Sequence, residues 1–263
     1  MKKVVVITGA SSGIGKITAE FLYEKGFVIY GLSRSKGDSE GINYIKCDVT
    51  DKENVKEAFN EIANKANHID FVINNAGIGV SGAIEYASEE ELEKIFSVNV
   101  FGVVNVCQEA IPHLRKTKGK IINIGSVAGP ITIPFQAYYS MTKIAIQSLS
   151  EALRMELKPF GIKVTTILPG DTKTNFTKNR YAPSVKENEI YKDRIINSIK
   201  RMEKDETSGV SPLKVTKVIY RVMKRKNPPI KRVVGFDYKL LVFLKRLLPD
   251  KLVNFIVYRL YAK

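Results

Sequence analysis

The sequence predicts an α/β fold: one doubly wound parallel sheet of about seven strands, with helices on both faces and a helical C-terminal extension. Short β-branched runs alternate along the chain with longer segments of helical spacing, and parallel strands need such crossover connections. A turn rich in glycine and serine also follows the first run directly. The chain has 263 residues, 44% of them hydrophobic, which excludes wholesale disorder. We expect residues 1–263 to form one domain.

The elements are expected in the following order. Buried strands are indicated by short apolar, β-branched runs at Val4–Ile7, Phe27–Leu32, Tyr44–Asp48, Phe71–Asn74, Lys120–Ile124, Lys163–Leu168 and, near the sheet edge, Arg232–Val234. Helices are indicated by apolar spacing and end signals at Ile14–Lys25 (closed by Gly26), Lys52–Ala66 (capped by Thr50), Glu89–Ile111, Ala137–Leu157, Tyr191–Arg201, Pro212–Lys226, Asp237–Leu248 and Asp250–Tyr261. The segment Asp171–Asn188 is polar and irregular.

The charge is unevenly distributed. The chain has 42 Lys and Arg against 27 Asp and Glu, a net charge of +15. Residues 1–177 hold 20 basic and 19 acidic side chains, whereas residues 178–263 hold 22 basic and 8 acidic ones. A nearly neutral body therefore precedes a strongly basic C-terminal part, which has to be explained separately.

The location suggested by the sequence is the cytoplasm. Two cysteines, Cys47 and Cys107, make no disulfide framework, which suits a reducing compartment. The first apolar run stops at Gly9, too early for a secretory signal, and no uninterrupted apolar run reaches the roughly 18 residues of a membrane span. The lack of Trp and the abundance of Lys, Ile and Asn suit an AT-rich bacterial genome.

The turn after the first strand has the character of a phosphate site. It reads Thr8-Gly9-Ala10-Ser11-Ser12-Gly13-Ile14-Gly15. Glycines allow a tight turn and close backbone approach, and the following helix start offers free N–H groups to a pyrophosphate. We expect cofactor contacts from Gly9, Ser11, Ser12, Gly13, Ile14 and Gly15.

A tyrosine and a lysine form the second motif. Tyr139 and Lys143 are four residues apart in an expected helix, so they share one face. A neighbouring ammonium lowers the pKa of a phenol from its ordinary value of about 10, which suits proton exchange with an alcohol or ketone. Ser126 follows the fifth strand and can hydrogen-bond the reacting oxygen. Tyr138 lacks a lysine at the matching position, because its fourth successor is Thr142.

Together these motifs resemble the short-chain dehydrogenase/reductase family. The spacing Gly-x-x-x-Gly-x-Gly, the element Asn74-Asn75-Ala76-Gly77, Asn99, Ser126, Tyr139-x-x-x-Lys143 and Pro169-Gly170 with Thr174 all occur in family order between Val4 and Thr174. The resemblance implies a Rossmann-like fold, a nicotinamide cofactor and a homodimer or homotetramer. It further implies Asn99, Ser126, Tyr139 and Lys143 as catalytic residues, with Asn99 supporting a water-linked proton relay. The remaining implied cofactor contacts are Asp48, Val49, Asn75, Ala76, Gly77, Pro169, Gly170, Thr172 and Thr174, besides Tyr139 and Lys143.

The end of the second strand favours NADP(H) over NAD(H). An acidic residue at this place would bind the ribose 2′-hydroxyl of NAD. The chain instead has Ser33, which can hydrogen-bond a phosphate, and Arg34, whose planar guanidinium suits one. Asp48 is expected beside the adenine, although it can equally cap its own turn.

The substrate is expected to be apolar. Ile133 and Phe135, between Ser126 and Tyr139, are candidates for the mouth of the site, or for packing beneath a lid. Residues 178–263 form a basic substrate lid and an extension of about 30 residues beyond the usual family end, similar to hydroxysteroid and retinol dehydrogenases. Its helices can dock on their own domain, cap the pocket, pack at a subunit interface or contact an anionic membrane.

The expected activity is therefore hydride transfer between NADP(H) and a secondary alcohol or ketone, with a hydroxysteroid or another lipid-like molecule as substrate. A 3-oxoacyl-acyl-carrier-protein reductase is the nearest alternative, since a basic surface would meet an acidic carrier. A non-catalytic scaffold or membrane-surface protein is a third. No metal site and no nucleic-acid partner are expected, because neither a ligand cluster nor a nucleic-acid-binding motif occurs in the sequence.

Overall fold

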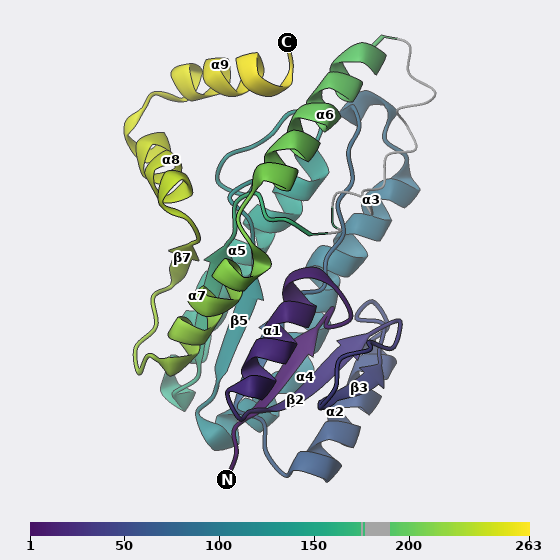
Figure 1. Ribbon diagram of the computed structural model, residues 1–263, viewed down its shortest axis with the longest axis vertical. Coiled ribbons are helices and arrows are strands. Elements are labelled where there is room, and N and C mark those ends of the chain that lie inside the picture. The colour runs from purple at the N-terminus through teal and green to yellow at the C-terminus, as the bar shows by residue number, and fades with distance from the viewer. Residues whose placement is uncertain (175, 177–189) are drawn as a thin grey trace.

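The computed structural model describes residues 1–174, 176 and 190–263. Seven parallel strands form one sheet in the order β3-β2-β1-β4-β5-β6-β7 (Figure 1). The strands are β1 Val4–Thr8, β2 Val28–Ser33, β3 Ile42–Lys46, β4 Phe71–Asn74, β5 Lys120–Ile124, β6 Lys163–Leu168 and β7 Lys231–Val233. The helices are α1 Gly13–Glu24, α2 Lys52–Ala66, α3 Glu89–Phe96, α4 Gly102–Thr117, α5 Ala137–Glu156, α6 Lys192–Ser208, α7 Pro212–Lys224, α8 Phe236–Leu247 and α9 Asp250–Tyr261, with short helical turns η1 Ile84–Tyr86, η2 Ser97–Phe101 and η3 Lys158–Phe160.

The strand order reverses between β1 and β4. The chain builds outward from β1 through β2 to β3, then returns to the other side of β1 with β4. The connections after β1 and β4 therefore run in opposite directions and leave a crevice at the carboxyl ends of the strands. Ligands bind at this place in open α/β sheets. All five residues of β1 are buried, as its central position requires.

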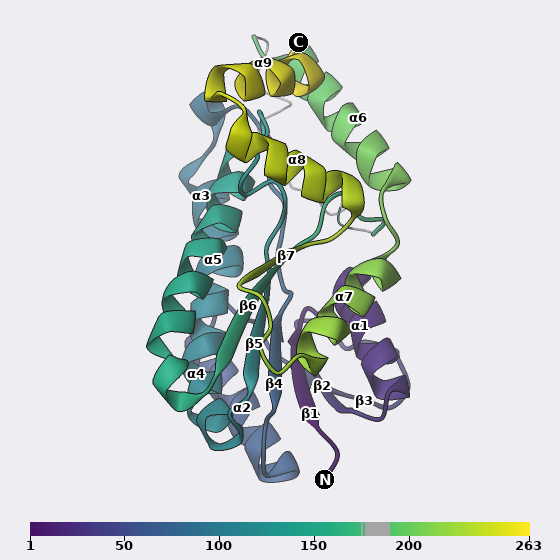
Figure 2. The same cartoon turned by 90° about the vertical axis from the view of Figure 1, so that its left-hand side faces the viewer.

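Two hydrophobic cores hold the three layers together. Figure 2 shows α2, α4 and α5 on one side of the sheet and α1 with α7 on the other. Phe59, Val106 and Ile121 belong to the core on the first side, and Leu22 and Ile219 to the core on the second. The apolar faces of these helices thus pack on the two sides of the sheet. The predicted fold class is confirmed.

The expected long helix after β4 is interrupted. It consists of α3, a π-helical turn at η2 and α4, and it continues past Pro112 to Thr117. Within the described chain, Glu89–Thr117 is the one helix of 29 residues whose most apolar window, with mean hydropathy 1.3, would allow a membrane span by length and composition. Contacts of α4 with α2, β4 and β5 show that it packs in the core instead.

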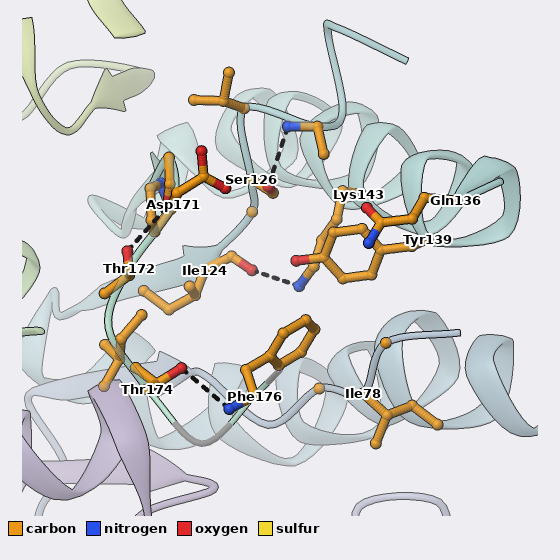
Figure 3. A pocket seen from close by; sticks show the side chains of 18 of the residues that line it. Ile78, Ile124, Ser126, Gln136, Tyr139, Lys143, Asp171, Thr172, Thr174 and Phe176 are labelled. Carbon is orange, nitrogen blue, oxygen red and sulfur yellow. Dashed lines mark hydrogen bonds between the residues drawn. The ribbon is translucent and has the colours of Figure 1, made fainter. Parts of the chain in front are cut away.

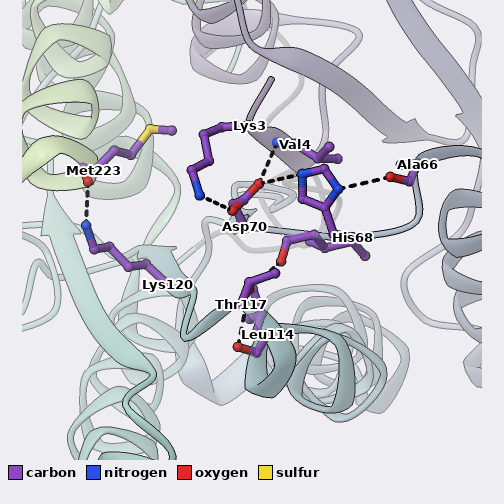
Figure 4. Close-up of polar contacts among 10 residues, drawn as sticks. Lys3, Val4, Ala66, His68, Asp70, Leu114, Thr117, Lys120 and Met223 are labelled. Carbon is purple, nitrogen blue, oxygen red and sulfur yellow. Dashed lines mark hydrogen bonds and ion pairs between the residues drawn. The ribbon is translucent and has the colours of Figure 1, made fainter. Parts of the chain in front are cut away.

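A polar cluster fixes the amino-terminal edge of the sheet (Figure 4). The Asp70 carboxylate accepts hydrogen bonds from the Val4 N–H (2.9 Å) and the Lys3 Nζ (2.7 Å), and His68 Nε2 lies 3.2 Å from it. On the far side Lys120 donates to the carbonyls of Met223 and Arg225 at the end of α7. These contacts hold β1, β4 and β5 at the edge opposite the crevice.

Several expected boundaries are corrected. Asp51, and not Thr50, caps α2: its side chain accepts from the Asn54 N–H, whereas the Thr50 hydroxyl donates to Asp48. β3 begins two residues earlier than predicted, α6 runs on to Ser208, and β7 is shifted back by one residue. Most of the polar segment expected at 171–188 lies outside the described residues.

Candidate active site

The turn between β1 and α1 is shaped by its glycines. Gly9 and Gly13 have positive φ values of 66° and 53°, a conformation that strongly favours glycine. A Cβ on Gly15 would lie 2.2 Å from the Gly9 carbonyl oxygen. Gly15 therefore permits the close packing of the helix start on the turn, while the first N–H groups of α1 stay available for an anion.

This turn is locked to the segment after β4. The Thr8 hydroxyl accepts hydrogen bonds from the backbone N–H groups of Asn75 and Ala76, both at 3.0 Å. The Asn75 amide in turn donates to the carbonyls of Thr8 (3.0 Å) and Gly9 (3.2 Å). The two edges of the crevice are therefore held at a fixed separation, and the glycine cradle with its helix N-terminus fits a dinucleotide cofactor.

One cavity of about 900 Å³ extends from this turn across the carboxyl ends of the strands. It contains nearly all of the expected cofactor contacts: Gly9, Ser11, Ser12, Gly13, Ile14, Ser33, Arg34, Asp48, Val49, Asn75, Ala76, Gly77, Tyr139, Lys143, Pro169, Gly170, Thr172 and Thr174. Gly15 is not in its lining. Gly15 is instead buried beneath the turn, where it packs against the Gly9 carbonyl.

The residues expected to choose the cofactor differ in availability. Arg34 is exposed and lines the cavity. Ser33 is mostly buried, and its hydroxyl donates to the Ser35 carbonyl at 2.7 Å. Asp48 accepts from both the N–H and the hydroxyl of Thr50, so it caps its turn while also lining the cavity. Arg34 therefore offers exposed N–H donors to the cavity, whereas the Ser33 hydroxyl is already hydrogen-bonded.

Tyr139 and Lys143 lie on one face of α5 and point into the cavity (Figure 3). Lys143 Nζ is 5.5 Å from the centre of the Tyr139 ring and donates to the Ile124 carbonyl at 3.1 Å. Lys143 is only 6% exposed, and this burial lowers the pKa of its ammonium to about 8. The Tyr138 hydroxyl instead donates to the Ile84 carbonyl.

Asn99 lies behind the cavity lining, in the π-helical turn η2. Its Oδ1 accepts from the Ile78 N–H (2.8 Å), and its amide donates to the Ile78 carbonyl (3.0 Å) and the Thr142 hydroxyl (3.1 Å). A Cβ on Gly77 would lie 3.3 Å from Asn99 Oδ1 and 3.6 Å from Lys143 Nζ. Asn99 thus holds the 76–78 segment against α5, close to the Lys143 ammonium. Thr142, next to Lys143, is a partner that sequence reasoning missed.

The depth of α5 is set by buried amides. Asn74 donates to Asn123 Oδ1 at 2.8 Å, and Asn123 donates to the Ser150 hydroxyl at 2.8 Å. This chain of hydrogen bonds joins β4, β5 and α5 in the interior, where unpaired polar groups would be costly. Ser126 follows β5, lines the cavity, and accepts from the Ala128 N–H at 3.0 Å; its hydroxyl hydrogen can then serve a ligand.

The segment after β6 closes the site from a second side. Phe176 places its ring 5.6 Å from that of Tyr139. Asp171 accepts a hydrogen bond from the Tyr238 hydroxyl of α8, and burial together with this carboxylate raises the pKa of Tyr238. A Cβ on Gly170 would meet the Tyr238 ring at 2.3 Å. Neither Phe176 nor Tyr238 was expected from the sequence, because they come from segments without a recognisable motif.

α8 and α9 lie over the carboxyl ends of the strands (Figures 1 and 2). Their apolar side chains line the cavity from this side and form its roof. α9 is anchored at its end: the Tyr261 hydroxyl donates to Asp205, and the Arg194 Nε donates to the Ala262 carbonyl at 2.9 Å. The roof residues are Leu241, Leu244, Leu248, Val253, Ile256, Val257 and Leu260.

The two residues expected at the substrate, Ile133 and Phe135, do not line the same set of cavities. Ile133 lines the main cavity, whereas Phe135 lines a second cavity of about 600 Å³ that also contains Ile133.

Comparisons with known proteins agree with this geometry. Residues 3–184 match the short chain dehydrogenase family. The chain is 42% identical to the 3-ketodihydrosphingosine reductase of Bacteroides thetaiotaomicron, covering 99% of this chain and 98% of that protein. It is 32% identical to mouse estradiol 17-beta-dehydrogenase 2 over 89% of this chain and 63% of that one. A short-chain dehydrogenase from Streptomyces avermitilis superposes with a TM-score of 0.84 at 28% identity, covering 95% of this chain and 93% of that one.

Proposed function

The chain belongs to the short-chain dehydrogenase family, oxidoreductases that act on CH–OH groups with a nicotinamide cofactor, and we propose that it reduces the ketone of a lipid-like substrate with NADPH. The observation that carries the proposal is the junction of two surfaces in one cavity. Tyr139, Lys143 and Ser126 form its polar floor, and the apolar side chains of α8 and α9 form its roof. A ketone attached to a hydrocarbon matches both surfaces.

The proposed chemistry assigns one task to each polar residue. The bound cofactor supplies the hydride that goes to the carbonyl carbon. The Tyr139 hydroxyl gives its proton to the carbonyl oxygen, which becomes the alcohol oxygen, and the Ser126 hydroxyl donates a hydrogen bond to the same oxygen. The Lys143 ammonium stabilises the phenolate that Tyr139 leaves behind, until a proton returns from solvent. Asn99 acts as a positioning residue, because its side chain bonds the Ile78 backbone and Thr142.

We propose NADP(H) over NAD(H) from the end of β2. Arg34 lies at the cavity with no acidic residue beside it in Tyr30-Gly31-Leu32-Ser33-Arg34, so a 2′-phosphate would meet a guanidinium and not a carboxylate.

The substrate we propose joins a ketone to a long hydrocarbon chain, as 3-ketodihydrosphingosine does. The whole-length similarity to a reductase of that compound supports this choice, as does the mostly apolar roof. A ketosteroid is the second candidate, supported by the similarity to an estradiol dehydrogenase. The test is a panel of 3-ketodihydrosphingosine, a 17-ketosteroid, a 3-oxoacyl thioester and a simple short ketone, each followed at 340 nm with NADPH and with NADH. Fastest turnover of the thioester would overturn the lipid-ketone proposal.

We also propose that α8 and α9 serve as a lid whose outer side contacts an anionic membrane. Phe236, Leu240, Phe243 and Leu247 recur at helical spacing on the outside of α8, and Phe236 and Leu247 are 77% and 65% exposed. Exposed Lys239 and Arg246 flank this stripe, and Lys251 and Arg259 lie on the outside of α9. Aromatic and aliphatic groups bordered by cations suit the surface of an anionic bilayer.

The membrane proposal is tested by co-sedimentation with vesicles containing about 30% phosphatidylserine. We expect the wild type to pellet with these vesicles and F243S/L247S to remain in the supernatant. The variant L213S, which removes an exposed leucine of α7, is the matched control and should pellet normally. Equal pelleting of all three proteins would contradict the proposal.

A different surface supports our proposal of a homo-oligomer. Met141, Ile144 and Met155 are exposed apolar side chains along α5, and Phe101 is exposed just before α4. Light scattering on a sizing column should give a mass of two or four chains for the wild type and a lower one for I144D. A monomeric wild type would contradict the proposal.

A further inference from the structure

The second cavity adjoins the first and is separated from it by two side chains. It has a volume of about 600 Å³ and lies between the loop at 82–85, the loop at 132–137 and α9. Ile133 and Val257 belong to the linings of both cavities. The two spaces therefore meet at this pair, one side chain from the strand side and one from the roof.

The lining of the second cavity is mostly apolar, and the cavity is partly open to solvent. Pro134, Phe135 and Val257 provide its inner wall. Ile84, at 63% exposure, and Tyr258, at 48%, form its outer rim. Apolar side chains grouped along one groove that continues from a cavity indicate a ligand-binding extension of that cavity.

The wall carrying Phe135 is built with local strain. Phe135 has a φ of 59°, in the left-handed region that residues with a side chain rarely adopt. Its carbonyl accepts from the Gly82 N–H at 2.9 Å, which ties the two loops across the groove. The Phe135 ring packs 6.3 Å from that of Tyr191, and the Arg194 guanidinium lies 5.7 Å from the Phe135 ring.

Tyr191 and Arg194, two polar side chains at the groove, already have partners. The Tyr191 hydroxyl is hydrogen-bonded to Glu85, which raises the pKa of Tyr191, and Arg194 donates to the Ala262 carbonyl. The groove thus offers mostly aromatic and aliphatic surface, with the Glu85 carboxylate hydrogen-bonded to Tyr191 and with Thr132 and Asn254 as further polar side chains of its lining.

We infer that the second cavity binds the distal part of a long unbranched hydrocarbon chain whose ketone is held at Tyr139. The inference rests on the proposed function and adds that the substrate is linear. A flexible chain can pass between Ile133 and Val257 and bend into the groove, whereas a rigid fused-ring molecule fills the main cavity and stops at this pair. Removing apolar contacts in the groove then weakens the binding of long chains selectively, since a short chain does not reach it.

The experiment compares two methyl ketones, of about 6 and about 16 carbons, in kcat/KM with NADPH. We expect the wild type to favour the longer ketone, and I84S/Y258S to lower the ratio of long-chain to short-chain kcat/KM by about tenfold, with the loss in KM. The matched control is I230S, which replaces an isoleucine of 48% exposure just before β7, and it should keep the wild-type ratio.

A second measurement does not depend on turnover. A pyrene-labelled 16-carbon alcohol should bind the wild type and lose about tenfold in affinity on I84S/Y258S but not on I230S. An unchanged long-to-short ratio or unchanged probe affinity in I84S/Y258S overturns the tail site, even where ketones are reduced. Binding of the probe with the expected loss, in a protein that reduces neither ketone, overturns the proposed function and leaves the tail site standing.

Discussion

The floor and the roof of the main cavity are held in place by different interactions. On the floor, buried polar side chains are joined by hydrogen bonds, as between Asn74, Asn123 and Ser150 or between Asn99 and Thr142. The roof consists mostly of leucines, isoleucines and valines of α8 and α9. Hydrogen bonds of Tyr238 and Tyr261 attach it to the rest of the domain.

Because of this difference, substitutions in the floor and in the roof are expected to affect different properties of the protein. Directional hydrogen bonds fix atoms to within a few tenths of an ångström, which proton and hydride transfer demand. Apolar contact is non-directional and accepts many shapes. We therefore expect floor substitutions to alter chemistry and cofactor use, and roof substitutions to alter substrate affinity or the attachment of the lid.

The largest effect is expected from Y139F. Loss of the phenol proton should lower kcat by about 10³-fold, the usual contribution of general acid–base catalysis, while the dissociation constant for NADPH stays within about twofold. Y138F removes the neighbouring phenol, which faces Ile84, and should retain wild-type kcat within about twofold. A Y139F enzyme with near-normal turnover would remove Tyr139 from the floor chemistry.

A smaller effect is expected from R34A. Loss of a charge-assisted contact to a 2′-phosphate should lower kcat/KM for NADPH by about 30-fold and leave NADH nearly unchanged. K36A, two residues away and outside the cavity lining, serves as the control. Steady-state kinetics with both cofactors measure the ratio, and an equal loss with NADPH and NADH would contradict the 2′-phosphate contact.

The buried Lys143 ammonium predicts that the rate of reduction depends on pH in the same way for every ketone. The pKa of Lys143 is lowered to about 8 by burial, and a lysine is charged only below its pKa. Ketone reduction should therefore be constant below about pH 8 and fall roughly tenfold per pH unit above it, as the charge that stabilises the Tyr139 phenolate is lost. A profile of kcat/KM from pH 6 to 10 measures this, and a rate that rises through this range would count against it.

The smallest effect is expected from Y238F in the roof. The substitution removes the hydrogen bond to Asp171, a loss of about 1 kcal/mol, which corresponds to a fall in Tm of roughly 2–4 °C for a protein of this size. Differential scanning calorimetry measures it, with Y258F, whose phenol is half exposed on α9, as the control. A fall in kcat greater than about tenfold in Y238F would break the separation between floor and roof.

Much of the floor could be predicted from the sequence because it depends on local rules. The positive φ values of the turn require glycine at positions 9 and 13. Tyr139 and Lys143 share a face because an α-helix repeats every 3.6 residues. The fold class followed from alternating strand and helix patterns, and it is confirmed. The catalytic and cofactor roles of these residues stay predictions for the experiments above.

The helix-cap error shows where local rules compete. Thr50 and Asp51 are both good capping residues and stand next to each other. Asp48 takes the Thr50 hydroxyl, so the cap of α2 falls to Asp51. A one-residue choice of this kind depends on which hydrogen bonds neighbours have already made.

The sequence by itself determined the order of the elements, the glycine-rich turn after β1, the Tyr139–Lys143 pair and the basic character of the C-terminal part, because each depends on residues close together in the chain. Only the tertiary structure decided that α8 and α9 roof the cavity and that Phe135 lines a second cavity beyond Ile133. The physical reason is that apolar contact carries no sequence spacing of its own. Leu241 lines the same cavity as Tyr139 although it lies more than a hundred residues later in the chain, and its burial there is non-directional.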